Sequence, residues 1–302
     1  MLIQDLVIHT NEGIQGAWIL PPPAPPLQGR FELTDDLWIG PLDEDVAERV
    51  LDCCEPPGCW VKKPLRLFHQ LYAYVREPVP PEAKHKWDAD NRLLDCVALS
   101  RLVHPTSVSF RYAGQIIYNS DGTVREVVPG PVQGHGADAW PPNEQDRDWL
   151  NDTDLELLKK LVSELPIANL PPRVWRAFWY HEFAARTGYA DVRCTLIVTA
   201  LEALVHTDRQ NSTRQFTERV PQLAADLGVA NLIKDDAETA YDLRSRLSHG
   251  QGLAIFTQAE REIYEWMELI LRAAIKRAIL DKQFAVVFSS DDLIRARWLL
   301  AP

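Results

Sequence analysis

The segment YDLRSRLSHG, residues 241–250, contains two side chains that suit chemistry on an anionic substrate, Arg244 and His249. The segment lies in a helix that we expect over residues 235–249, and helical spacing places Arg244 on or beside the apolar face of that helix. An arginine there keeps its charge, and burying a charge without a partner is costly. Arg244 therefore needs an anion, which is either a carboxylate of the protein or a phosphate of a ligand.

His249 is expected at the C-terminal end of the same helix. Gly250 and Gly252 follow it, and glycine just past the last turn is a common helix stop. This end leaves His249 free to turn toward the side of Arg244, and the helix dipole favours the charged form of a histidine there. An anion-binding arginine and a proton-transferring histidine together predict acid–base chemistry on an anionic substrate.

Glu202 is the best internal partner for Arg244, because it flanks the apolar stripe of a helix that we expect over residues 190–206. Two interpretations follow. In the first, Arg244 forms a structural ion pair with Glu202 and His249 only bonds the last carbonyls of its helix. In the second, both side chains act on a ligand. Spacing alone favours the structural interpretation, because an arginine and a histidine five residues apart are common by chance.

The elements that position these residues are helical. Apolar residues recur at helical spacing throughout the second half of the chain, which predicts an all-α bundle over residues 148–302. We expect helices over residues 151–165, 171–188, 190–206, 212–228, 235–249 and 257–282. Ser212 and Gln215 form a capping-box pattern before the fourth of these. The tail, residues 284–300, is expected to add a strand and a last turn.

Residues 1–147 show a different pattern and predict an α+β domain. Proline-rich stretches separate short segments with strand-like alternation, among them RFELTDDLWIG at 30–40. The segment 107–128 predicts a hairpin around an Asp-Gly turn. Helices are expected over residues 43–54 and 88–103. No chemical motif distinguishes this domain.

Composition narrows the class of protein. The chain has 302 residues and a net charge of −11, which disfavours a protein that coats nucleic acid without sequence preference. No N-terminal stretch has the pattern of a secretion signal, and no apolar run is long enough for a membrane span. We expect a cytoplasmic protein without membrane contact.

Neither a metal site nor a cofactor is expected. The five cysteines lack the paired spacing of structural zinc sites, and an odd count without a secretion signal argues against a disulfide framework. His69, His85 and His104 have no metal-binding spacing among them, and His181-Glu182 lacks the second histidine of a zinc-binding helix.

Three segments in order, TALEALVH at 199–206, RQFTERVPQL at 214–223 and AYDLRSRLSHG at 240–250, resemble the Apea-like branch of the HEPN superfamily. The resemblance covers residues 150–282 and is most specific in the last segment. It implies an all-α HEPN bundle that follows the α+β N-terminal domain. In active members of the superfamily, arginine and histidine from two subunits meet in one composite cleft and cleave RNA without a metal ion.

The resemblance implies a role for each matching residue. Arg244 and His249 are the catalytic pair, and Glu202 orients Arg244. Tyr241 and Ser245 are the other matching positions of the segment and support the pair. Attack by the RNA 2′-hydroxyl gives a 2′,3′-cyclic phosphate and a 5′-hydroxyl, with histidine transferring protons and arginine stabilising charge on phosphorus. A neighbouring arginine, Arg246, either grips backbone phosphates or is a solvated surface residue.

Two functions remain at this point. The first is a homodimeric HEPN ribonuclease in toxin-like or antiviral defence, whose N-terminal domain senses or binds a regulatory protein or nucleic acid. The second is a non-catalytic HEPN scaffold that dimerises or binds nucleotides or partners. Two histidines at a symmetric dimer interface would answer the need for both an acid and a base.

Overall fold

The structure, a computed structural model, describes residues 14–19, 31–34, 37–40, 70–75, 88–105, 113–118, 124–129, 150–187, 189–208, 210–229, 233–249 and 257–300. The chain divides into two compact units, Met1–Ser163 and Glu164–Pro302, which are described separately. The division lies later in the chain than the boundary after residue 147 that the sequence suggested. The helix expected over 43–54 lies outside the described residues.

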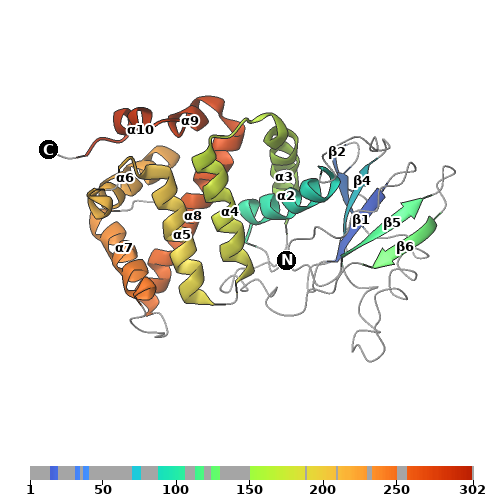
Figure 1. Cartoon of the computed structure of the whole chain (residues 1–302), viewed down its shortest axis with the longest axis horizontal. Helices are drawn as coiled ribbons and strands as arrows, with labels where there is room; N and C mark the ends of the chain where they lie inside the picture. The colour runs from blue at the N-terminus through green and yellow to red at the C-terminus, as the bar shows by residue number, and fades with distance from the viewer. Residues whose placement is uncertain are drawn as a thin grey trace. The chain divides into compact units, whose positions relative to one another are not determined.

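The first unit contains a six-stranded antiparallel sheet. Its strands are β1 (Ile14–Ile19), β2 (Phe31–Thr34), β3 (Leu37–Gly40), β4 (Gln70–Val75), β5 (Ala113–Tyr118) and β6 (Val124–Pro129). They pair in the order β2-β3-β4-β1-β5-β6. Helix α2 (Asp88–Val103) packs against β4 and β1. The antiparallel pair β2-β3 lies in the segment 30–40, where strand-like alternation predicted strands. The pair β5-β6 lies in the segment 107–128, which predicted a hairpin, and its two strands run side by side in Figure 1.

The second half of the chain is helical, as its apolar periodicity predicted. The helices are α3 (Asp152–Glu164), η2 (Leu165–Ile167), α4 (Pro172–Arg186), α5 (Ala190–Val205), α6 (Ser212–Leu227), α7 (Lys234–Ser248) and α8 (Gln258–Leu280). Helix α3 belongs to the first unit except for its last residue. Among the described helices, none is long and apolar enough to cross a membrane.

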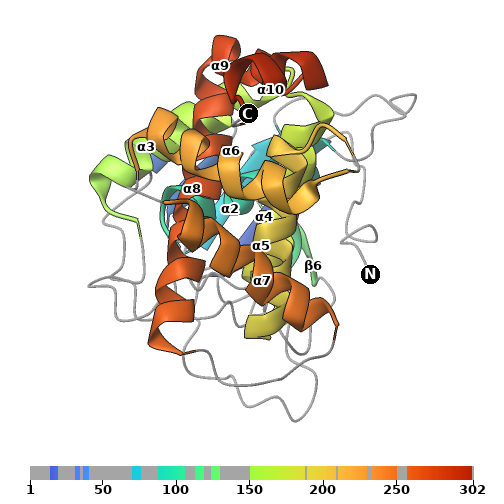
Figure 2. The same ribbon diagram turned by 90° about the vertical axis from the view of Figure 1, so that its left-hand side faces the viewer.

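Helix α5 is the central element of the second unit. It packs against α4, α6, α7 and α8, which surround it in two perpendicular views (Figures 1 and 2). Ile197, Leu201 and Leu204 are each at most 1% exposed, since spacings of three and four residues bring them onto the faces that meet its neighbours. The packing of these helices around α5 therefore fixes the positions of the polar side chains that α5 carries.

The tail differs from the expected strand and forms two short helices, α9 (Lys282–Val287) and α10 (Asp291–Arg297). The side chains of Asp281 and Ser290 cap their first turns by accepting backbone N–H bonds. The rings of Phe284 and Phe288 meet edge to face with a centroid distance of 5.3 Å, and Phe288 also contacts Trp298. Four-residue spacing brings these rings together, whereas strand alternation would have placed Val286 inward, and Val286 is 55% exposed.

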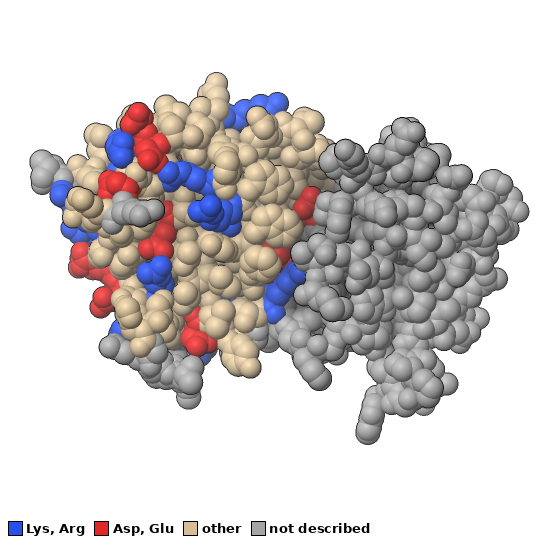
Figure 3. All heavy atoms as spheres, viewed as in Figure 1, with Lys and Arg blue, Asp and Glu red and all other residues tan. Residues whose placement is uncertain are grey.

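Charges of both signs are mixed on the face of the second unit that Figure 3 shows. On the face shown in Figure 3, Lys and Arg side chains lie among Asp and Glu side chains rather than forming one broad basic area. This mixture agrees with the acidic net charge of −11. Any anion bound on this face is therefore held by a few local cations.

Candidate functional site

Arg244 and Glu202 form the ion pair that helical register predicted. Arg244 Nη2 on α7 donates to Glu202 Oε2 on α5 at 2.9 Å. Glu202 is buried at 9% exposed, and the Arg244 side chain is 27% exposed. The carboxylate belongs to the central helix, so it fixes the guanidinium at the α5–α7 contact. Arg244 Nε is buried and has no hydrogen-bond partner among the described residues.

Tyr241 completes the immediate surroundings of this pair. The Arg244 guanidinium lies 5.7 Å from the centroid of its ring, within the range of a cation–π contact. The ring of Tyr241 also contacts the ring of Phe216 on α6, with a centroid distance of 5.3 Å. Burial and the carboxylate of Glu202 raise the pKa of Tyr241. Tyr241 is thus a neutral packing and hydrogen-bonding residue that supports the position of Arg244.

His249 lies at the C-terminal end of α7 and is exposed. Its backbone N–H donates to the carbonyl of Ser245 at 3.1 Å, which closes the last turn. Within the described part of the chain, its imidazole forms no hydrogen bond or ion pair with Arg244 or Glu202. The structure therefore brings Glu202, Arg244 and Tyr241 into contact and leaves His249 at the same helix end, facing solvent.

Arg246 has a partner that the sequence did not suggest. Its Nη2 donates to Glu260 Oε1 at 2.6 Å, although its side chain remains 49% exposed. Glu260 also accepts from the backbone N–H of Thr257 at 2.9 Å as part of the capping box of α8. These bonds from Thr257 and Arg246 lower the pKa of Glu260. Arg246 thus ties the end of α7 to the beginning of α8.

His206, which the sequence analysis left without a role, lies one turn after Glu202 at the end of α5. Its Nε2 is 3.0 Å from the carbonyl oxygen of Ser212, so Nε2 carries the proton of this bond. Burial lowers the pKa of His206 against the opposing effect of Glu202, and the charges of Arg219 and Arg244 act in the same direction as burial. The signal for it was the four-residue spacing from Glu202, which brings two side chains to one helix face.

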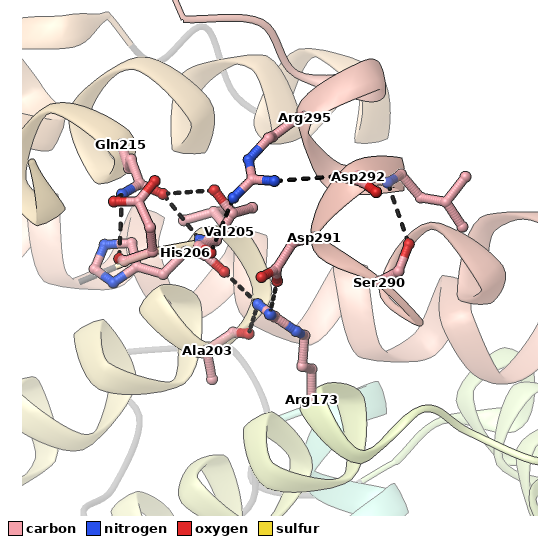
Figure 4. A network of polar contacts seen from close by, with 12 residues as sticks. Arg173, Ala203, Val205, His206, Gln215, Ser290, Asp291, Asp292 and Arg295 are labelled. Carbon is pink, nitrogen blue, oxygen red and sulfur yellow. Dashed lines mark hydrogen bonds and ion pairs between the residues drawn. The ribbon is translucent and has the colours of Figure 1, made fainter. Parts of the chain in front are cut away.

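Arg173 on α4 closes the end of the same helix. Figure 4 shows it pointing toward Ala203 and Asp291. Its guanidinium donates to the backbone carbonyls of Ala203 and His206 and pairs with Asp291 of α10. The last carbonyls of a helix have no partner within that helix, so this arginine satisfies part of that need and places a cation at the negative end of its dipole.

The capping box that Ser212 and Gln215 were expected to form does not occur at the start of α6. The helix begins after Asn211, whose φ of 55° is left-handed, and no side chain caps it. The fully buried side chain of Gln215 instead accepts from Thr207 N at 2.9 Å and from Arg219 Nη1 at 2.9 Å. Its amide donates to Asp208 Oδ1 at 2.9 Å. Gln215 therefore fixes the connection between α5 and α6, beside His206 (Figure 4).

A cavity of about 780 Å³ opens between α4, α5 and the beginning of α6. Arg173, Arg176 and Tyr180 line it from α4, and Glu202 and His206 line it from the end of α5. Glu202 therefore both lines the cavity and binds Arg244. Sequence reasoning missed Arg176 and Tyr180, because a polar stripe on an otherwise apolar helix also fits a solvated surface.

Comparison of the chain with known protein families, curated proteins and solved structures gave no significant match. In the portion of the chain that the structure describes, no group of three or more His, Cys, Asp or Glu side chains is arranged to hold a metal ion.

Proposed function

We propose that the second unit is a HEPN-type bundle and that the protein is a metal-independent RNA endonuclease. The observation that carries this proposal is the position of Arg244. Glu202 fixes its guanidinium at 2.9 Å, yet 27% of the side chain remains exposed, at the helix end that also presents His249. A fixed, charged and accessible arginine near a histidine suits a phosphodiester substrate.

The proposed reaction uses the nucleophile of the RNA itself. His249 accepts the proton of the 2′-hydroxyl as its oxygen attacks phosphorus, and the bond from phosphorus to the 5′-oxygen breaks. The leaving oxygen takes a proton from a general acid, so the products are a 2′,3′-cyclic phosphate and a 5′-hydroxyl. Arg244 stabilises the negative charge that develops on the phosphoryl oxygens.

The general acid is proposed to be His249 of another copy of the chain. One imidazole cannot act as base and acid in the same step, whereas a two-fold dimer presents two. Arg246, half exposed while paired with Glu260, is a proposed contact to flanking phosphates. Toxin-like or antiviral defence, with the first unit sensing a protein or nucleic-acid trigger, is the biological role that fits this activity.

One observation favours a second candidate, a non-catalytic dimerising or partner-binding scaffold. The anion that Arg244 requires is already supplied within the chain by Glu202. Ion pairs of this kind also occur as purely structural contacts between helices. In that case, replacing Arg244 lowers stability and changes no reaction.

The test is incubation of the purified full chain with total RNA in EDTA, followed by mapping of the RNA ends. We expect cleavage that EDTA does not reduce, with 2′,3′-cyclic phosphate and 5′-hydroxyl ends. Intact RNA after incubation would favour the scaffold, and a strict requirement for a divalent metal would contradict the proposed mechanism.

A further inference from the structure

The last turn of α7, which carries Arg244 and leads to His249, has little apolar packing to hold it. Leu243 is the last residue of α7 that is buried, and residues 244–249 are all partly or fully exposed. Helix ends that bury few side chains open easily, with free energies close to zero. The position of His249 therefore depends on the polar contacts of this turn.

Among the described residues, two ion pairs link this turn to other helices. Arg244 Nη2 donates to Glu202 Oε2 on α5 at 2.9 Å. Arg246 Nη2 donates to Glu260 Oε1 on α8 at 2.6 Å. Residues two apart in a helix differ by about 200° around its axis, so the two arginines project from opposite sides of α7. The turn is therefore held on one side by α5 and on the other by α8.

The carboxylate of Glu260 is also fixed from within its own helix. Its Oε2 accepts from the backbone N–H of Thr257 at 2.9 Å and from the Thr257 hydroxyl at 3.0 Å. These bonds leave Oε1 for Arg246, so one carboxylate joins the beginning of α8 to the end of α7. The bonds from Thr257 and Arg246 lower the pKa of Glu260, so the carboxylate is ionised at neutral pH.

We propose that Glu260 is a positioning residue for His249. By holding Arg246, it keeps the last turn of α7 formed and fixes the imidazole relative to the guanidinium of Arg244. This role rests on the proposed ribonuclease function, because it concerns the placement of the residue that transfers the proton. A misplacement of about 1 Å can cost about a hundredfold in rate, so a residue that touches no substrate can still determine the rate.

The Arg246–Glu260 pair suits local order more than global stability. The Arg246 side chain is 49% exposed, and exposed ion pairs contribute little to the free energy of unfolding. The last turn of a helix, however, can form or fray while the rest of the bundle stays folded. Loss of the carboxylate of Glu260 should therefore loosen His249 and leave the bundle folded.

The test compares Glu260→Gln with Glu262→Gln in the full chain. Glutamine also serves at this position of a capping box, so Glu260→Gln can keep the beginning of α8 while it removes the charge. Glu262 is the matched control, since it is exposed in the same part of α8 and bonds Gln258 of its own helix at 3.0 Å. Circular dichroism verifies that both variants are folded.

The order parameter of the His249 backbone amide, from NMR relaxation, measures how firmly this residue is held. We expect about 0.85 in the wild type and in Glu262→Gln, and less than about 0.6 in Glu260→Gln. The kcat for RNA cleavage should fall about tenfold or more in Glu260→Gln. KM should not rise, because the substitution removes a negative charge beside Arg246, the proposed phosphate contact.

Combining Glu260→Gln with His249→Ala separates positioning from general damage to the fold. If Glu260 acts through His249, its replacement changes the remaining rate of His249→Ala less than about twofold. An equal fall in both backgrounds overturns the proposal, as does an unchanged kcat or an unchanged order parameter in Glu260→Gln. A loosened His249 in a chain that cleaves no RNA contradicts only the ribonuclease. Normal cleavage by Glu260→Gln contradicts only the positioning role.

Discussion

At the scale of single residues, Glu202 is the group on which the site depends. It is a buried carboxylate on the central helix, it holds the guanidinium of Arg244, and it lines the neighbouring cavity. Replacing a charged partner of such a pair leaves the other charge poorly compensated. The effect of replacing Glu202 on the free energy of unfolding is therefore measured separately from its effect on RNA cleavage.

We predict that Glu202→Gln lowers the free energy of unfolding by about 1–3 kcal/mol, since the hydrogen bond to a charged group is lost. Urea denaturation measures this loss. The control is Glu238→Gln on α7, where an exposed pair with Lys234 at 3.9 Å should contribute less than about 0.5 kcal/mol. Equal effects of the two substitutions would contradict a buried, structurally important pair.

His206 makes the free energy of unfolding depend on pH. Burial lowers its pKa in the folded chain, so the unfolded chain takes up this proton at a higher pH, near the ordinary value of about 6.5. As the pH falls below that value, protonation stabilises the unfolded state first, and the free energy of unfolding decreases. The decrease is at most about 1.4 kcal/mol per pH unit for this one proton and ends below the folded pKa.

His206→Gln should remove this part of the pH dependence. Urea denaturation of both proteins at about pH 8 and about pH 5 tests it. We expect the wild type to lose more stability than the variant over this interval. Parallel losses would show that His206 is not the group responsible.

At the scale of elements, the helices were predictable and their connections were not. Each long helix of the second unit has apolar residues at spacings of three and four, so burial decides both its extent and its orientation. The Arg244–Glu202 pair followed from that register. The partners of Gln215, Arg246 and His206 depend instead on how neighbouring helix ends approach each other, and spacing along the chain contains no information on that approach.

The strand expected in the tail is the clearest wrong prediction at this scale, because the tail forms the helices α9 and α10. The sequence FAVVF favours a strand by local propensity, but tertiary packing overrides such preferences. Trp298 is 1% exposed, and its Nε1 donates to Asp226 Oδ2 at 2.9 Å. Its carbonyl accepts from Arg219 Nε at 3.2 Å. These contacts join the tail to α6, and α9 and α10 lead the chain to that position.

Trp298→Ala should therefore lower the free energy of unfolding by about 3–5 kcal/mol, the usual cost of truncating a large buried aromatic side chain. Leu299→Ala is the matched control, because Leu299 is adjacent and 68% exposed, and its effect should be within about 0.5 kcal/mol. Chemical denaturation followed by circular dichroism compares them. A small effect of Trp298→Ala would mean that the tail does not contribute to the stability of the bundle.

At the scale of the whole molecule, the proposed mechanism requires two copies of the chain, because His249 must serve as both acid and base. Mixing wild type with an equal amount of His249→Ala should then form inactive mixed dimers by random pairing. Cleavage per wild-type chain should fall, so an equal mixture retains about a quarter of the activity of an all-wild-type sample at the same total concentration. Half the activity would show that each chain works alone.

The measurement that tests the central claim most directly is the rate of RNA cleavage by His249→Ala. Ser248→Ala is the matched control, since it alters the neighbouring exposed residue at the same helix end. Circular dichroism verifies that both variants are folded. We predict that His249→Ala cleaves RNA at least about a hundredfold more slowly than wild type, as expected for loss of a general acid–base group, while Ser248→Ala retains its rate. Cleavage by folded His249→Ala at the wild-type rate would contradict the account.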